Sequence, residues 1–149
     1  MPDKLPVSAH MGRVALSVAD LQRSLTYYQE RIGLSLLRLD GETHGTERVE
    51  VAVLGTAERE LLHLHEQPGA RPTRGTTGLY HFALLLPSRL ALAKTLGHLI
   101  NTETPLDGAA VHNVSEALYL TDPDGHGIEI YRDRPRSEWH YLNGQLKMG

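Results

Sequence analysis

Hydrophobic positions alternate with polar ones in one stretch of the chain and recur every three to four residues in the next. Residues 13–18 (Arg-Val-Ala-Leu-Ser-Val) alternate and predict a strand, after which Asp20 is suited to cap a helix. The apolar residues that follow are spaced by four, three and four, at Leu21, Leu25, Tyr28 and Ile32. We therefore expect a helix that ends at Gly33, because glycine is common just after the last turn of a helix.

The pattern continues with strands and then starts again. Three strands are expected at 35–39, 48–54 and 60–66, and the segment 67–78, with two prolines and three glycines, indicates a linker. After the linker we expect a strand at 80–86 and a helix capped by Ser88. Three more strands are expected at 109–113, 116–121 and 127–131. The last two flank a strong turn signal, Asp122-Pro-Asp-Gly125.

The repeated order predicts an α+β fold of two tandem βαβββ modules that form a curved, partly closed mixed sheet. We expect a single domain over 1–149, with module one at about 8–67, module two at about 79–133 and a C-terminal arm at 134–149. Sliding one half onto the other pairs Arg13-Val-Ala-Leu with His81-Phe-Ala-Leu, and Leu62-His-Leu-His with Ile128-Glu-Ile-Tyr. A duplication of this kind predicts that equivalent positions converge on one shared cavity.

Composition narrows the classes of function. The chain has 149 residues, 40% hydrophobic and 22% charged, and a net charge of -3, which gives no electrostatic case for binding nucleic acid or an anionic membrane. No apolar run is long enough to span a bilayer, and no secretion signal is apparent, so we expect a cytoplasmic protein. Cysteine is absent and histidine occurs nine times. Any transition-metal site must therefore use His, Asp and Glu.

Several motifs in this order resemble the vicinal oxygen chelate superfamily, which includes glyoxalases, extradiol ring-cleaving dioxygenases and fosfomycin or bleomycin resistance proteins. The motifs are Val18-x-Asp-Leu-x-x-Ser-x-x-x-Tyr28 with Ile32-Gly-Leu34, and Leu120-Thr-Asp-Pro-Asp-Gly125 with Ile128-Glu129. The strings 78–89, 114–125 and 127–139 are most similar to the N-terminal half of bacterial catechol-2,3-dioxygenase-like proteins. Members of that group are often about twice as long as this chain.

The resemblance implies metal ligands on the first and last strand of each module, at the positions of Arg13, His63, His81 and Glu129. The last three form the donor set of non-haem Fe(II) oxygenases. Fe(II) or Mn(II) is favoured, and Zn(II) or Ni(II) also suits these donors. Arginine cannot bind a cation, so Arg13 is instead a candidate to bind substrate, together with His65.

Each of these residues also has a purely structural explanation. His81 can be a core histidine bonded to a neighbouring carbonyl, and Glu129 can be an exposed strand residue or pair with an arginine. His63 and His65 share a face, and both can simply line a solvated sheet. If Arg13 pairs with Glu129, no metal is needed. His10 is an alternative ligand if the chain bends.

The expected function is a metal-dependent, extradiol (catechol-type) ring-cleaving dioxygenase or its N-terminal half. Extradiol cleavage needs a base and a proton donor, and Tyr131, Tyr119 and His112 are candidates by residue type, whereas His126 is expected at the surface. The alternatives are a glyoxalase-type lyase or isomerase, and a binding or resistance protein that holds an aromatic ligand without turnover. The expected partners are a small aromatic or diol substrate and a second copy of the chain in a homodimer.

Overall fold

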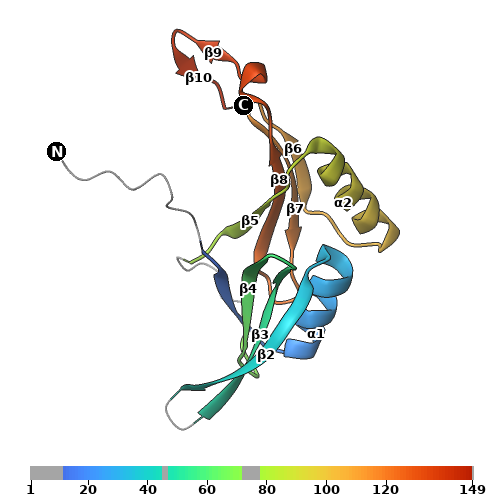
Figure 1. Cartoon of the computed structure of the whole chain (residues 1–149), viewed down its shortest axis with the longest axis vertical. Coiled ribbons are helices and arrows are strands. Elements are labelled where there is room, and N and C mark those ends of the chain that lie inside the picture. Colours follow the sequence, from blue (N-terminus) through green and yellow to red (C-terminus); the bar gives the residue numbers. More distant parts are fainter. Residues whose placement is uncertain (1–11, 45–46, 72–77, 149) are drawn as a thin grey trace, which may run out of the picture.

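The computed structural model describes residues 12–44, 47–71 and 78–148, which form two four-stranded mixed sheets (Figure 1). The first sheet, in the order β1-β4-β3-β2, contains β1 (Val14–Val18), β2 (Ser35–His44), β3 (Glu47–Thr56) and β4 (Arg59–Glu66). The second, in the order β5-β8-β7-β6, contains β5 (His81–Leu85), β6 (Gly108–Val111), β7 (Ser115–Thr121) and β8 (Gly127–Asp133). In each sheet the two strands that come first and last in the sequence, β1 with β4 and β5 with β8, pair in parallel. The other strand pairs are antiparallel.

The helices lie on one side of the two sheets and leave the opposite side uncovered (Figure 1). Helix α1 (Leu21–Thr26) is capped by the side chain of Asp20 and continues as a π-helix, η1 (Tyr27–Ile32), which ends at Gly33 with φ 86°. Helix α2 (Arg89–Asn101) is capped by Ser88. The C-terminal arm carries a short 3-10 helix, η2 (Arg136–Glu138), and a hairpin of β9 (Tyr141–Leu142) and β10 (Gln145–Leu146).

The core lies between the helices and the inner faces of both sheets. Leu62 and Leu64 of module one and Ile128 and Ile130 of module two are each at most 2% exposed. These side chains belong to one cluster together with the buried residues of α1, η1 and α2. Because a strand directs alternate side chains to opposite faces, the residues between these apolar positions must point to the uncovered side.

The strand register confirms the internal duplication. Val14 lies opposite Leu62 in the β1–β4 pair, and Phe82 lies opposite Ile128 in the β5–β8 pair. Residue 13 therefore corresponds to His81, and His63 corresponds to Glu129. This is the alignment that the two sequence halves predict.

The α+β fold with two βαβββ repeats is confirmed, with differences in detail. Over residues 12–44, 47–71 and 78–148 the two sheets stay separate and do not close into a barrel. Strand β2 extends five residues beyond the predicted 35–39, and the π-helical second half of the first helix and the hairpin of the arm were not predicted. The predicted start of module one at residue 8, His10 and part of the predicted linker lie outside the described residues.

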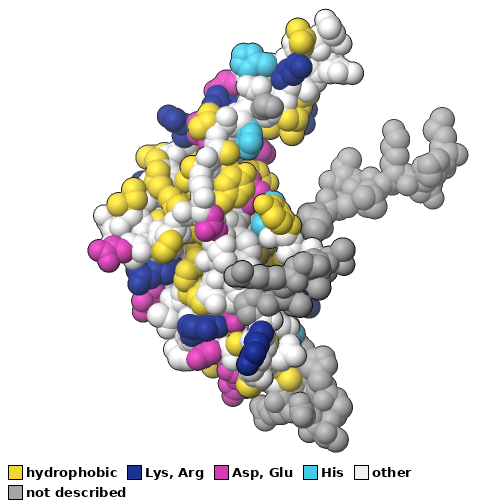
Figure 2. Space-filling model, turned by 180° about the vertical axis from the view of Figure 1, so that it is seen from behind, with side chains coloured by type: hydrophobic (Ala, Val, Ile, Leu, Met, Phe, Trp, Pro, Cys, Tyr) yellow, Lys and Arg dark blue, Asp and Glu magenta, His cyan; other side chains and the backbone are white. Residues whose placement is uncertain are grey.

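The exposed surface has a mixed character. On the face shown in Figure 2, acidic and basic side chains are interspersed, and hydrophobic side chains gather over the middle of the molecule. Within the described ranges, no helix combines the length and the apolar character that crossing a bilayer requires.

Candidate functional site

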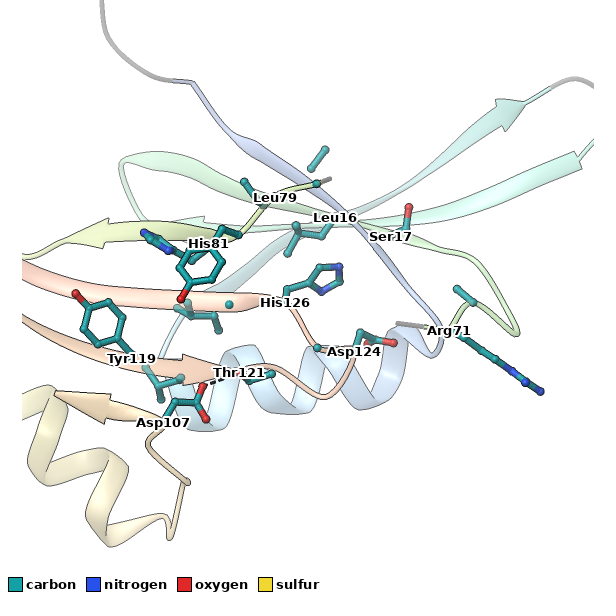
Figure 3. A pocket seen from close by; sticks show the side chains of 18 of the residues that line it. Leu16, Ser17, Arg71, Leu79, His81, Asp107, Tyr119, Thr121, Asp124 and His126 are labelled. Carbon is teal, nitrogen blue, oxygen red and sulfur yellow. Dashed lines mark hydrogen bonds between the residues drawn. The ribbon is translucent and has the colours of Figure 1, made fainter. Parts of the chain in front are cut away.

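An open cleft of about 1120 Å³ lies where the two modules meet (Figure 3). Strand β1 contributes Leu16 and Ser17 to its walls, and β5 contributes His81 at its first residue. Tyr119 of β7 and His126, in the turn before β8, also line the cleft. The cleft is large enough for a small organic ligand, because such sites usually measure 300–1,000 Å³.

His81 and Glu129 form a direct contact beside this cleft. Nε2 of His81 lies 2.9 Å from Oε2 of Glu129, and the two side chains are 32% and 17% exposed. The hydroxyl of Tyr119 lies 3.4 Å from Oε1 of Glu129 and is placed to donate a long hydrogen bond to it. Glu129 faces the uncovered side of the sheet because its neighbours Ile128 and Ile130 pack beneath the helices.

Close packing fixes the backbone of His81. Gly127 lies opposite His81 in the parallel β5–β8 pair. A Cβ atom at residue 127 would lie 2.5 Å from the carbonyl oxygen of Tyr80 and 3.0 Å from Cβ of His81. Only glycine therefore fits at this position without displacing the strand that carries His81.

His63, the third expected ligand, does not join the pair. Its Nε2 atom lies 3.2 Å from Oε2 of Glu60, and the residue is 7% exposed. The hydrogen bond from Arg38, and to a smaller extent that from His63, lowers the pKa of Glu60 to about 2. The carboxylate of Glu60 is therefore ionised at neutral pH and available to contact His63. The structure thus brings together two of the three residues that the resemblance implies as metal ligands.

The remaining sequence-derived candidates lie apart from the pair or beside it. Arg13 is exposed just before β1, and no ion pair joins it to Glu129 in the described ranges. The ring of His65 lies 6.5 Å from that of His63, on the sheet of module one. Tyr131 is two residues past Glu129 and shares its face, whereas His112 lies in the turn between β6 and β7. None of the four is among the residues that line the cleft.

The donor atoms present fit part of a metal site. An imidazole and a carboxylate 2.9 Å apart suit a first-row divalent ion. Ligating histidines normally donate their second ring nitrogen to an acceptor, but Nδ1 of His81 is buried with no hydrogen-bond partner in the described part of the chain. No group of three or more His, Asp or Glu side chains that could hold an ion occurs among the described residues.

Sequence reasoning missed a buried polar cluster at the far wall of the cleft. Asp122, which is 4% exposed, accepts a hydrogen bond from the hydroxyl of Tyr28 at 2.8 Å and contacts Nδ1 of His126 at 2.9 Å. Its other oxygen accepts hydrogen bonds from the backbone N–H groups of Asp124 and His126. His126 thus belongs to the cleft wall and not simply to the outer surface. The spacing of Asp and His by four residues in a turn is the only local signal for this contact.

The same turn attaches module two to module one. Asp124 accepts hydrogen bonds from the guanidinium of Arg23 at 2.7 Å, the hydroxyl of Ser24 at 3.1 Å and the backbone N–H of Ala19 at 3.0 Å. Together with the Tyr28–Asp122 bond, these contacts join residues about 100 positions apart in the sequence. The cleft wall that carries His126 is therefore held in place by the first helix.

This cluster should give the protein a window of maximal stability in mildly acidic solution. Burial alone would raise the pKa of Asp122, but hydrogen bonds from His126 and Tyr28 outweigh burial, and the pKa is lowered from 3.8. The hydrogen bond to Asp122 raises the pKa of His126 above 6.5 although burial opposes it. The carboxylate stabilises the fold above pH 3.8 and loses that contribution as pH falls through its lowered pKa. The imidazolium contributes fully below pH 6.5 and loses its contribution as pH rises through its raised pKa.

Urea unfolding at a series of pH values from 3 to 9 measures this dependence. The free energy of unfolding should be highest between the two unfolded-state values, 3.8 and 6.5, and should decline on both sides. His126→Asn should remove the decline on the alkaline side, because asparagine does not titrate. A wild-type profile that stays flat from pH 6 to 9 would contradict the assignment to His126.

Comparison with known proteins identifies relatives of this chain in sequence. The model of the Glyoxalase/Bleomycin resistance protein/Dioxygenase superfamily matches residues 10–130. Catechol-2,3-dioxygenase of Bacillus subtilis is 46% identical over 132 residues, which cover 87% of this chain and 44% of that protein. This chain thus spans less than half the length of that relative.

Two solved structures show the same fold. The glyoxylase/bleomycin resistance protein/dioxygenase domain from Frankia sp. has a TM-score of 0.66 at 21% identity, over 85% of this chain and 98% of that one. Lactoylglutathione lyase from Agrobacterium tumefaciens has a TM-score of 0.61 at 20% identity, over 87% of this chain and 96% of that one. At this level of identity the similarity extends to the fold alone.

Proposed function

Because this chain belongs to the glyoxalase/bleomycin resistance/dioxygenase superfamily, we propose that it is an extradiol-type (catechol-type) ring-cleaving dioxygenase or the N-terminal half of one. The observation that carries the proposal is the contact between His81 and Glu129 beside an open cleft. The 46% identity to catechol-2,3-dioxygenase of B. subtilis supports aromatic diols as the ligand class.

His81 and Glu129 are the residues that would hold a divalent ion, with Fe(II) or Mn(II) favoured by the donor types. Such an ion would supply Lewis acidity and a template for the two oxygens of a diol. The described part of the chain provides two donors and no third, since His63 is engaged by Glu60. We therefore propose roles in ligand binding and proton transfer for the side chains of this chain.

The two tyrosines on this face are suited to donate hydrogen bonds. Burial, and then the charge of Glu129, raises the pKa of Tyr119 above 10.0, so its hydroxyl keeps its proton at neutral pH. Burial and then Asp133 raise the pKa of Tyr131 in the same direction. A protonated phenol beside the cleft can donate to an anionic ligand oxygen, and the exposed cation of Arg13 would attract the same charge.

Anaerobic loading with Fe(II), followed by a panel of catechols and then air, tests the proposed activity. A yellow ring-fission product should form together with the uptake of oxygen. The matched samples are metal-free protein and protein loaded with redox-inert Zn²⁺, which should bind the ligand without consuming oxygen.

The outcomes separate the proposal from its alternatives. Failure of every catechol to give a product would refute the dioxygenase. Isomerisation of a thiol adduct with Ni(II) or Zn(II), without oxygen consumption, would identify a lyase or isomerase on this fold. Protein that binds a catechol but takes up no metal, by elemental analysis and thermal shift, would be a ligand-binding protein.

A further inference from the structure

The Asp122–His126 cluster has the arrangement of an acid–base pair as well as that of a structural contact. Both oxygens of the Asp122 carboxylate accept hydrogen bonds, and Nδ1 of His126 lies 2.9 Å from one of them. An ionised carboxylate can only accept, so Nδ1 of the imidazole must carry a proton. The neutral ring then holds its lone pair on Nε2.

Nε2 of His126 is the atom left available. It makes no hydrogen bond in the described part of the chain, and it is not among the buried polar atoms that lack a partner. His126 lines the same cleft as His81 and Tyr119, and its ring extends from the turn toward the space between the modules (Figure 3). A basic nitrogen with a fixed orientation therefore faces the cavity.

The charges around His126 favour its protonated form. Asp122 is in direct contact and Asp124 lies nearby, and both raise the pKa of His126. Arg23 neutralises Asp124 through a 2.7 Å contact, and the hydroxyl of Tyr28 is bonded to Asp122. From β1 the cleft receives the uncharged side chains of Leu16 and Ser17. The imidazolium that forms on proton uptake would thus meet a buried carboxylate.

We propose that His126, oriented by Asp122, is the proton acceptor for a hydroxyl group of a diol bound in the cleft. The O–H bond of the ligand breaks, its electron pair stays on the oxygen, and the proton forms an N–H bond at Nε2. The products are a ligand monoanion and an imidazolium paired with Asp122. The choice of a diol rests on the proposed function, whereas the orientation of His126 rests on the contacts described above.

The test compares wild-type protein with His126→Asn. The amide nitrogen of asparagine replaces Nδ1 as the donor to Asp122, so the carboxylate that accepts from Tyr28 keeps this second donor while the titrating nitrogen is lost. His140→Asn, at an exposed residue of the C-terminal arm, is the matched control for loss of a histidine. The probe is 4-nitrocatechol, whose ionisation changes its visible spectrum, with Zn²⁺ added so that no turnover occurs.

The readout is the pH at which the bound probe becomes half ionised. In wild-type protein and in His140→Asn, the bound probe should become half ionised at a lower pH than the free probe does. His126→Asn should raise this midpoint by about one pH unit, which is a tenfold loss of anion binding. Urea unfolding at pH 9 should remain within about 1 kcal/mol of wild type, because the hydrogen bond to Asp122 is retained and the stabilisation by the imidazolium declines in wild type as pH rises.

The possible results distinguish this inference from the proposed function. If wild-type protein does not bind 4-nitrocatechol, the diol-binding function is refuted and this inference with it. If the probe binds and its midpoint is the same in His126→Asn, the inference alone is refuted. Nitrogen NMR of the ligand-free protein gives a second check, since a neutral His126 with its proton on Nε2 would also overturn the inference.

Discussion

Asp122→Ala should lower the free energy of unfolding by about 3–5 kcal/mol, the usual cost of removing one partner from a buried charged contact. The carboxylate is 4% exposed and accepts from Tyr28, from the backbone of Asp124 and from the backbone of His126, besides contacting Nδ1 of His126. Alanine leaves these donors without a partner at the junction of the modules, and each buried orphan carries a desolvation cost.

Equilibrium unfolding in urea at pH 6 measures this loss. Asp133→Ala is the matched control, because Asp133 is an exposed aspartate at the end of β8, and its removal should change the free energy by no more than about 0.5 kcal/mol. Tyr28→Phe removes one donor only and should cost about 1–2 kcal/mol. A loss below about 1 kcal/mol in Asp122→Ala would show that the cluster does not hold the modules together.

Glu129→Gln should weaken the binding of a divalent metal ion by about a hundredfold or more. The substitution keeps the size of the side chain and an acceptor for Tyr119, but it removes the anionic donor that lies 2.9 Å from Nε2 of His81. Substitution of residues that hydrogen-bond to metal ligands typically lowers metal affinity about 10–100-fold, so loss of a ligand should lower the affinity at least as much. His81→Ala should have an effect of the same size.

Isothermal titration with Zn²⁺ measures the affinity, and unfolding in chelator shows that each variant is folded. His63→Gln is the informative comparison, because His63 contacts Glu60 and should contribute no more than about a threefold change in affinity. Equal Zn²⁺ affinity in wild type and Glu129→Gln would show that the His81–Glu129 pair is not the metal site. A large loss in His63→Gln would restore His63 as a ligand.

The architecture was accessible from the sequence because local patterns determine it. Alternation at 13–18 and the three-to-four spacing from Leu21 to Ile32 depend on neighbours in the chain, and both gave elements of the right type. The duplication then made His63 the counterpart of Glu129, as the register confirms. Element ends were less accurate, since β2 continues well beyond its predicted end.

The candidate site was predictable only in part, because its contacts join distant segments. His81 and Glu129 were found through the order of strands and the resemblance to a family, and the structure places them in contact. The engagement of His63 by Glu60 depends on the path of β4 after the turn, which no spacing rule describes. The burial of Asp122 depends on Tyr28, 94 residues away, so a single sequence offered no reason to place His126 at the cleft.

In the ranges that the structure describes, the two sheets share no backbone ladder. Among the described residues every strand pairs within its own half, so the angle between the halves is set by side chains at the turn 122–126 and by the packing of η1 against α2. Substitutions at a few such positions can widen or narrow the binding space while leaving every ladder intact. A lineage can therefore adapt to bulkier or slimmer molecules without redesigning its strands.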